Sequence, residues 1–251
     1  MTTPQSALPD LTIAFQPICQ LATRAPIGYE ALLRGPGGRP IPVLAWIDQA
    51  AREGWLPRLL HRAWALAAQH AGDVLRPSEV LFVNWDQRAA PPPRLPWPKT
   101  VVELSERLPL TPDAVAALHA LGARVAMDDF GHGVTTMRVL TPPGVDVIKL
   151  DMTIVRGVDR DPARRALLRG LVDLCLTLAP GVWIIAEGIE TEGELQALVD
   201  CGISLGQGFL LGVPELAPAF RAPATQGAPP GPASAPMPPR QIPRPRRGGD
   251  R

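Results

Sequence analysis

Polar and charged residues recur along this chain, each following a short apolar run. The series is Glu30, Asn84, Glu103, Asp128 with Asp129, Lys149 with Asp151, Glu187 and Gln207. If the runs are neighbouring strands, these carboxylates gather in one place and raise each other's pKa unless cations are present. Carboxylate and amide oxygens, with no His or Cys among them, favour Mg²⁺ or Mn²⁺ over zinc. The series therefore predicts metal-dependent chemistry.

The chemistry that such a site performs best is attack of water on a phosphodiester. Two ions about 3.5–4 Å apart activate a water and stabilise the leaving oxygen. Lys149 is the one cation of the series, and it can steady the hydroxide or the charge that develops on the phosphate. Any single acid is more often part of a surface ion pair, so the prediction depends on the shared position at strand ends. For Glu106, Asp151 and Glu190, a role as a cap or a dipole partner competes with a role in the site.

The elements that must position these residues alternate regularly. Residues 11–15 and 27–33 are predicted strands, and their short connection favours antiparallel pairing. Helices are predicted over 42–52 and 57–70. The later predicted strands are 80–84, 100–104, 124–127, 145–150, 182–186 and 203–205. Apolar strands that alternate with helices indicate a parallel sheet covered by helices, and about eight of them predict a closed barrel.

Helix boundaries have clear local signals. Helices are expected to begin at Thr111 with Pro112, at Asp161 with Pro162, and at Thr191, where Glu194 completes a capping box. Gly122 and Gly202 occupy positions expected for helix C-caps.

Length and composition set the remaining bounds. A chain of 251 residues is long enough for one barrel domain, here expected over residues 1–220. Residues 221–251 are rich in Pro and Arg and are expected to be disordered.

The formal net charge of +1 gives no reason to expect a nucleic-acid polymer or a membrane as partner. Cys19, Cys175 and Cys201 are widely spaced and predict reduced thiols in a cytoplasmic protein.

Seven motifs in order make the chain resemble the EAL domain family of phosphodiesterases, which hydrolyse cyclic di-GMP. The resemblance runs from Phe15 to about Pro214. The motifs are Glu30-Ala31-Leu32 with Leu33-Arg34, Val83-Asn84, Glu103-Leu104-Ser105-Glu106, Asp128-Asp129-Phe130-Gly131, Lys149-Leu150-Asp151, Ala186-Glu187-Gly188-Ile189-Glu190 and Gln207-Gly208. Each motif alone is weak, and their order makes the signal specific.

This resemblance implies a TIM-like (β/α)8 barrel whose first strand is antiparallel. It also implies two Mg²⁺ or Mn²⁺ ions per active site, hydrolysis of cyclic di-GMP to linear pGpG, and a homodimer. The implied metal ligands are Glu30, Asn84, Glu103, Asp128, Asp129 and Glu187. The implied catalytic residues are Lys149, Glu187 and Gln207, the implied substrate contacts are Gln16, Leu32, Arg34 and Asp151, and Glu106 and Glu190 are expected to brace loops.

Three segments depart from the family pattern. The loop His132-Gly133-Val134-Thr135-Thr136 replaces the common Thr-Gly-Tyr-Ser-Ser, and Trp85-Asp86 replaces Leu-Ser. The third is Phe209-Leu210-Leu211-Gly212-Val213-Pro214, which follows Gln207-Gly208. These changes bear on substrate affinity and dimer form more than on metal binding.

Two other functions stay open at this point. An EAL-like module could hold cyclic di-GMP or a protein partner without turnover, and loss of a metal ligand would favour it, but none is lost. An unrelated barrel hydrolase, such as a glycosidase with a carboxylate pair, has no use for Asn84, the paired aspartates and Lys149 together.

Overall fold

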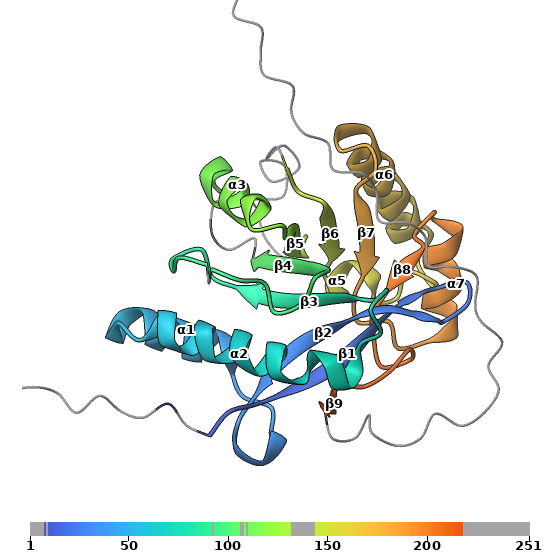
Figure 1. Cartoon of the computed structure of the whole chain (residues 1–251). Coiled ribbons are helices and arrows are strands. Elements are labelled where there is room, and N and C mark those ends of the chain that lie inside the picture. The colour runs from blue at the N-terminus through green and yellow to red at the C-terminus, as the bar shows by residue number, and fades with distance from the viewer. Residues whose placement is uncertain are drawn as a thin grey trace, which may run out of the picture.

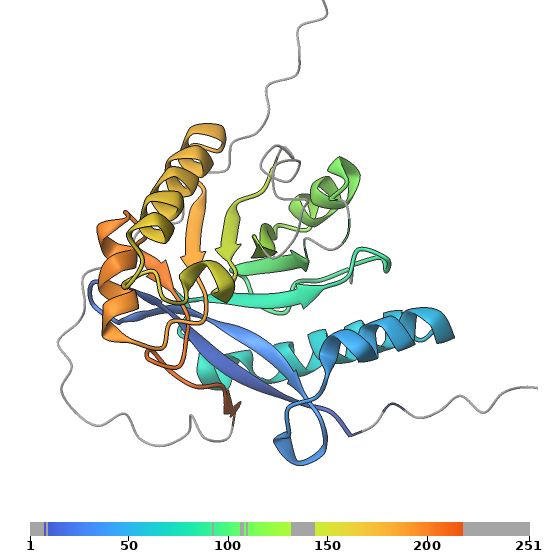
Figure 2. The ribbon, with the colours of Figure 1, turned by 180° about the vertical axis from the view of Figure 1, so that it is seen from behind.

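Eight strands close into a barrel in the computed structural model, which describes residues 8, 10–91, 93–105, 108, 110–131 and 144–217. Helices lie around the outside of the barrel (Figures 1 and 2). The predicted domain boundary near Phe220 and the predicted tail at 221–251 lie outside the described residues.

The strands follow one another around the barrel in chain order. They are β1 (Thr12–Gln20), β2 (Pro26–Arg34), β3 (Val80–Trp85), β4 (Thr100–Ser105), β5 (Arg124–Phe130), β6 (Val147–Leu150), β7 (Trp183–Ala186) and β8 (Leu205–Gly206). Strand β1 is antiparallel to both β2 and β8, whereas neighbours from β2 to β8 are parallel. A short β9 (Glu215–Leu216) pairs with β1 beside this ring. The predicted barrel with an antiparallel first strand is confirmed.

The helices begin and end largely where local signals place them. They are α1 (Val43–Glu53), α2 (Leu56–Val74), α3 (Pro112–Ala120), α5 (Met152–Val155), α6 (Pro162–Leu178) and α7 (Glu192–Asp200), with a 3₁₀ turn at Pro36–Gly38. Thr111 and Asp161 cap α3 and α6, and the capping box of Thr191 and Glu194 opens α7. Gly54 ends α1 in the left-handed conformation. None of the helices in this part of the chain is long and apolar enough to cross a membrane.

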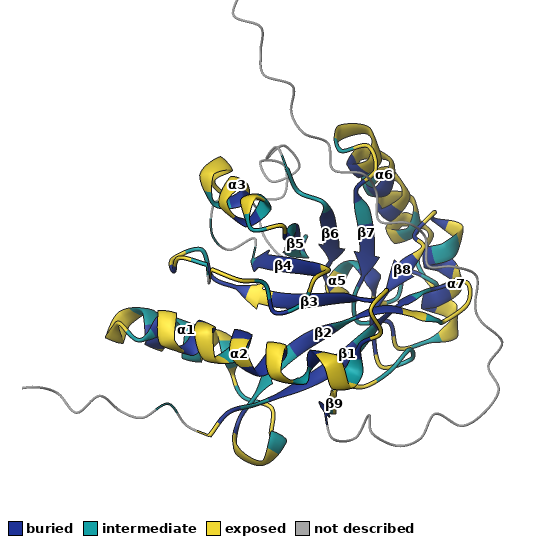
Figure 3. Ribbon diagram, viewed as in Figure 1, coloured by how far each residue is buried: buried dark blue, intermediate teal, exposed yellow. Residues whose placement is uncertain are grey.

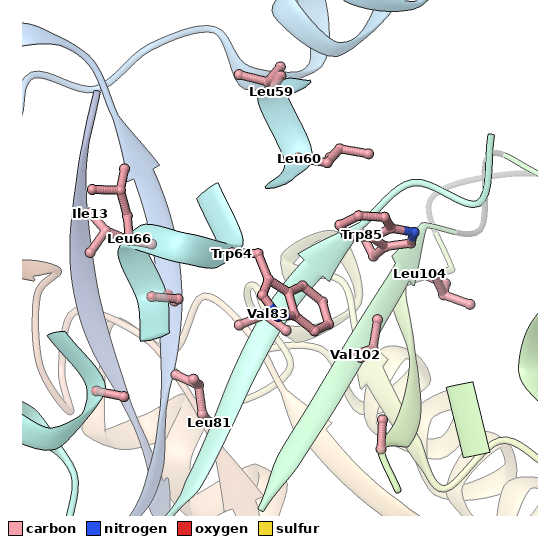
Figure 4. Close-up of a cluster of buried hydrophobic side chains, with 14 of the residues drawn as sticks. Ile13, Leu59, Leu60, Trp64, Leu66, Leu81, Val83, Trp85, Val102 and Leu104 are labelled. Atoms are coloured by element: carbon pink, nitrogen blue, oxygen red, sulfur yellow. The ribbon is translucent and has the colours of Figure 1, made fainter. Parts of the chain in front are cut away.

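Three groups of buried apolar residues hold the layers together. One fills the barrel interior with residues from all eight strands: Ile18, Ile27, Val80, Phe82, Val101, Ala126, Val147, Ile185 and Leu205. The second lies between the first strands and α1, α2 and α3, and the third packs α6 and α7 on the later strands. In the second group, Trp64 of α2 meets Trp85 of β3 edge to face, with 5.2 Å between ring centroids (Figure 4). The strands are consequently buried while the helices expose their outer faces (Figure 3).

Several strand boundaries differ from the predictions. Strands β1 and β2 have nine residues each and pair over almost their whole length, with Gln16 opposite Glu30. Glu30 therefore lies inside β2 and not at its end. Strand β5 continues through Asp128 and Asp129 to Phe130. In each case pairing with a neighbour extends the strand beyond its most apolar residues, which a local pattern does not reveal.

Candidate active site

The polar residues predicted at the strand ends lie one layer above the apolar interior of the barrel. Side chains alternate between the two faces of a strand, so residues two apart point the same way. The interior apolar residue and the polar residue two positions on are Phe82 and Asn84, Val101 and Glu103, Ala126 and Asp128, Val147 and Lys149, Ile185 and Glu187, and Leu205 and Gln207. The sequence pattern alone thus brings these six polar side chains to one end of the barrel.

Lys149 lies at the centre of this layer with four carboxylates around it. Its Nζ is 2.6 Å from Glu187 Oε1, 2.7 Å from Glu103 Oε1, 3.0 Å from Asp128 Oδ1 and 3.4 Å from Glu30 Oε2. The Lys149 side chain is only 1% exposed. A buried ammonium must be paired, and here one cation serves acids of β2, β4 and β5 and the residue directly after β7.

Two amides, Asn84 of β3 and Gln207 after β8, bind Glu30 of β2. Asn84 Nδ2 donates to Glu30 Oε1 at 3.0 Å and to Glu103 Oε2 at 3.1 Å. Gln207 Nε2 donates to Glu30 Oε2 at 2.8 Å and to Gln16 Oε1 at 3.0 Å. Glu30 therefore has three polar neighbours that fix its orientation. Asn84 is exposed, so the layer opens to solvent at this side.

The second group of acids depends on an irregularity in β5. The register of β5 against β6 shifts between Met127 and Phe130, and Asp129 has a positive φ of 59°. In a regular strand consecutive side chains point to opposite faces, whereas a bulge can re-aim one of them. Here Asp128 and Asp129 both approach Glu187, and one carboxylate oxygen of each lies within 4.8 Å of the others. These three acids form a group that could hold a metal ion.

The electrostatics show how crowded the negative charge is. Burial, and next the charge of Glu30, raise the pKa of Glu103 well above its usual value. Burial also raises the pKa of Glu187 to about 8, although Lys149 opposes this. Burial tends to lower the pKa of Lys149, but the surrounding acids outweigh it and raise that pKa well above its usual value. For Glu30, burial acts upward, yet Lys149 and the amide hydrogen bonds bring the pKa below its ordinary value.

The residues present fit a divalent cation. An ammonium has three N–H donors, but four acids surround Lys149. Glu103 Oε1 and Asp128 Oδ1 are buried and receive no well-aligned hydrogen bond among the described residues, despite their short distances to Nζ. With Asp129, five carboxylates and one ammonium leave a formal charge of −4 when all are ionised. Such a set of oxygen donors suits Mg²⁺ or Mn²⁺.

The residues predicted to contact substrate lie in different settings. Gln16 is held by its bond from Gln207 and donates its own Nε2 to the Gly212 carbonyl at 3.0 Å. Arg34 is half-buried, which lowers its pKa, and its Nη1 donates to the Leu33 carbonyl at 3.0 Å. Leu32, near the end of β2, is half-buried.

The remaining predicted residues serve the loops. Asp151 caps α5 by accepting from the Thr153 N–H at 2.8 Å. Glu190 is exposed and pairs with Arg156, and Glu106 lies outside the described residues.

Sequence reasoning missed two partners of the site. Gly212 contributes a carbonyl that fixes Gln16, and Arg156 pairs with Glu190. Neither contact has a local signal in the sequence. Gln16 and Gly212 are 196 positions apart, and Arg156 and Glu190 are 34 positions apart.

Comparison with known proteins agrees with this geometry. Residues 5–214 match the family described as EAL domain. The cyclic di-GMP phosphodiesterase PdeL of Escherichia coli K12 is 36% identical over 121 residues, which are 46% of this chain and 33% of PdeL. An uncharacterised protein of Azorhizobium caulinodans is 29% identical over 231 residues, 80% of this chain and 31% of that protein. The chain spans about a third of the length of these relatives.

Solved structures share the fold. The manganese and cyclic di-GMP complex of Klebsiella pneumoniae BlrP1 superposes with a TM-score of 0.71 at 27% identity, covering 86% of this chain and 59% of BlrP1. A standalone EAL protein from Vibrio cholerae, also with cyclic di-GMP bound, gives 0.65 at 24% identity and covers 86% of this chain and 100% of that one. The second likeness supports the fold alone.

Proposed function

Because the chain belongs to the EAL domain family, we propose that it is a metal-dependent phosphodiesterase that hydrolyses cyclic di-GMP to linear pGpG. The observation that carries the proposal is the ring of buried carboxylates around Lys149, completed by Asn84 and Gln207. All the predicted metal ligands are present and lie at one end of the barrel. Relatives named cyclic di-GMP phosphodiesterases and a manganese complex of BlrP1 support the substrate and the cofactor.

Two groups of residues would hold two ions. Glu30, Asn84, Glu103 and Asp128 would hold the first, and Asp128, Asp129 and Glu187 would hold the second. Bound Mg²⁺ or Mn²⁺ supplies an activated water and stabilises negative charge on the phosphate. The formal charge of the ring, four negative charges in excess, matches that of two divalent ions.

The chain's own residues have distinct parts in this proposal. Lys149 stays protonated because acids surround it, so it can stabilise charge on the reacting phosphate and orient the water. Glu187 would bind an ion or, alternatively, accept the proton of the water. Gln207 holds Glu30 and Gln16 in place through its Nε2.

Substrate contacts are proposed for Gln16, Leu32, Arg34 and Asp151. Arg34 supports this assignment most directly, because its guanidinium has donors left over for a phosphate oxygen after its bond to Leu33.

A homodimer through α6 is also proposed. Leu167, Leu174 and Leu178 are 74%, 37% and 47% exposed and recur at helical spacing on one face. The stripe is apolar and exposed, so the same stripe of a second copy can cover it.

The cytoplasm is the compartment that we propose. Cys19, Cys175 and Cys201 are all free and buried. Free thiols persist where glutathione and thioredoxin keep them reduced.

The function is tested by incubating purified protein with cyclic di-GMP and either Mg²⁺ or Mn²⁺, and following the linear product by chromatography. We expect pGpG to form with metal and to be abolished by EDTA. Asp128→Asn should lower turnover by more than about a hundredfold, because this carboxylate belongs to both ligand groups. Asp173→Asn, an exposed acid of α6, is the matched control.

Wild-type turnover in Asp128→Asn would contradict the assignment. Saturable binding of cyclic di-GMP without product would indicate a receptor, and the altered segment at 132–136, which lies outside the described residues, would then be the first to exchange.

A further inference from the structure

Two glycines next to the second group of acids lie against the same short helix, α5. Gly131 comes two residues after the paired aspartates, and Gly188 directly follows Glu187. A Cβ at Gly131 would lie 2.2 Å from Ile154 Cδ1, and one at Gly188 would lie 2.5 Å from Met152 Cβ. Both glycines also have positive φ, 106° and 68°. The backbone of both loops therefore rests directly on α5, with no room for a side chain between them.

The position of α5 follows from the sheet order. Strand β6 lies between β5 and β7, and α5 begins directly after β6. The junction of β6 and α5 is bonded to both sides: the Asp151 N–H donates to the Phe130 carbonyl at 3.1 Å, and the Leu150 carbonyl accepts from the Glu187 N–H at 3.0 Å. Consequently α5 stands between Gly131, which follows β5, and Gly188, which comes after β7.

This helix is itself held at both ends. Asp151 caps its first turn through the Thr153 N–H. At the other end Arg164 of α6 donates from Nη1 to the carbonyls of Thr153 and Arg156, at 3.1 and 3.2 Å. Val155 is fully buried in the core. A helix of one turn fixed in this way can act as a rigid spacer.

We propose that Ile154 is a positioning residue for the second metal position. On this view α5 sets the distance between the end of β5, which carries Asp128 and Asp129, and the segment of Glu187 that follows β7. Ile154 acts through the end of its side chain, whereas at Met152 it is the Cβ that faces Gly188, and alanine keeps that atom. The inference rests on the proposed function, because it concerns the same acids.

The geometry explains why such a spacer matters. The three carboxylate oxygens of this group lie within 4.8 Å of one another, a spacing that one ion can bridge. They come from strands that are not neighbours, so no backbone ladder joins them directly. A misplacement of about 1 Å in a site of this kind can cost about a hundredfold in rate.

Three substitutions on α5 separate positioning from general stability. Ile154→Ala removes Cγ1 and Cδ1, the two atoms nearest to Gly131, and Ile154→Val removes Cδ1 alone. Met152→Ala keeps the Cβ that faces Gly188 and is the matched control on the same helix.

The primary readout is Mn²⁺ binding without substrate, followed by the electron paramagnetic resonance signal of the free ion. We expect binding to weaken by about tenfold or more in Ile154→Ala, by an intermediate factor in Ile154→Val, and by less than about twofold in Met152→Ala. With cyclic di-GMP, kcat should fall in the same order while KM changes little. Thermal melting checks that each variant is folded.

Mn²⁺ binding in Ile154→Ala equal to that of the wild type would overturn the inference. An equal loss in Met152→Ala and Ile154→Ala would also overturn it, since any disturbance of α5 would then have the same effect. Wild-type protein that binds Mn²⁺ but does not hydrolyse cyclic di-GMP would contradict the proposed function. The inference about α5 would still be tested by Mn²⁺ binding of the variants. Wild-type protein that binds no Mn²⁺ would contradict both.

Discussion

At the scale of single residues, the site concentrates negative charge that one lysine only partly neutralises. Lys149 meets four acids within 3.4 Å. Burial holds the pKa of Glu103 and Glu187 above the usual range, and an added cation would favour their charged forms. Divalent ions would offset this crowding, so we expect the activity to depend strongly on a metal.

Gln207 offers a test of how the amides support the ring. Its Nε2 donates to Glu30 and Gln16, whereas its buried Oε1 has no partner among the described residues. Gln207→Met keeps the length of the side chain and removes both bonds. We expect kcat to fall by about 10–100-fold, as for other residues that orient a metal ligand, with little change in thermal stability.

The control is Gln20→Met. Gln20 is the last residue of β1, four positions beyond Gln16, which Gln207 contacts. Steady-state kinetics with both variants check the prediction. Unchanged kcat in Gln207→Met would show that Glu30 keeps its orientation without the amide.

At the scale of elements, helix α7 holds the loop after β7 in place. The Glu194 carboxylate accepts from the N–H groups of Gly157, Glu190 and Thr191, each at 3.1 Å. It thereby ties the start of α7 both to the loop that follows Glu187 and to the segment between α5 and α6. Local capping signals in the sequence predicted the bond to Thr191, but not the bond to Gly157, which is 37 positions away.

Glu194 should make stability depend on pH. Partial burial acts to raise its pKa, but the backbone hydrogen bonds outweigh burial and lower it below the usual value. A carboxyl whose pKa is lowered by folding adds stability above its unfolded pKa, near 4.3, and loses it as the pH falls through the folded value. We expect Glu194→Gln to lower the free energy of unfolding by about 1 kcal/mol at pH 7, and by less at pH 3.

Urea unfolding at the two pH values measures this difference. Glu192→Gln, an exposed acid of the same helix turn, should show a smaller effect at both. An equal loss at pH 7 and pH 3 in Glu194→Gln would mean that its charge is not what stabilises the loop.

At the scale of the whole molecule, metal binding should stabilise the fold. Ligand bound only to the folded state at about 100 times its dissociation constant adds about 2.7 kcal/mol. For a domain of this size, each kcal/mol of added stability raises the Tm by roughly 2–4 °C. We expect Mn²⁺ to raise the Tm and EDTA to reverse the rise, as measured by differential scanning calorimetry. The rise should be largely lost in Asp128→Asn, and a full rise in that variant would place the ion elsewhere.

Assembly is also a property of the whole molecule. If two copies pair through α6, Leu174→Glu should convert a dimer to a monomer in sedimentation velocity, because it places a charge in the apolar stripe. Leu44→Glu on α1, where the leucine is 51% exposed, is the matched control and should leave the dimer intact. A wild-type monomer, or a dimer that survives Leu174→Glu, would contradict the proposed interface.

The sequence alone determined the features that depend on neighbours in the chain. Alternation of apolar strands with capped helices predicted the barrel, because strand and helix periodicity and capping are local. The same alternation placed Asn84, Glu103, Asp128, Lys149 and Glu187 at one end, since side chains two apart share a strand face.

Only the tertiary structure decided how these residues meet. The register of β1 on β2 set Glu30 opposite Gln16 inside a long strand. The irregularity in β5 turned Asp129 toward Glu187, and Lys149 became the centre of the ring because four separate strands close around it. The contact of α5 with Gly131 and Gly188 likewise depends on strand order. Distances of this kind join segments far apart in the chain, and they are fixed by sheet pairing and core packing, which no local pattern encodes.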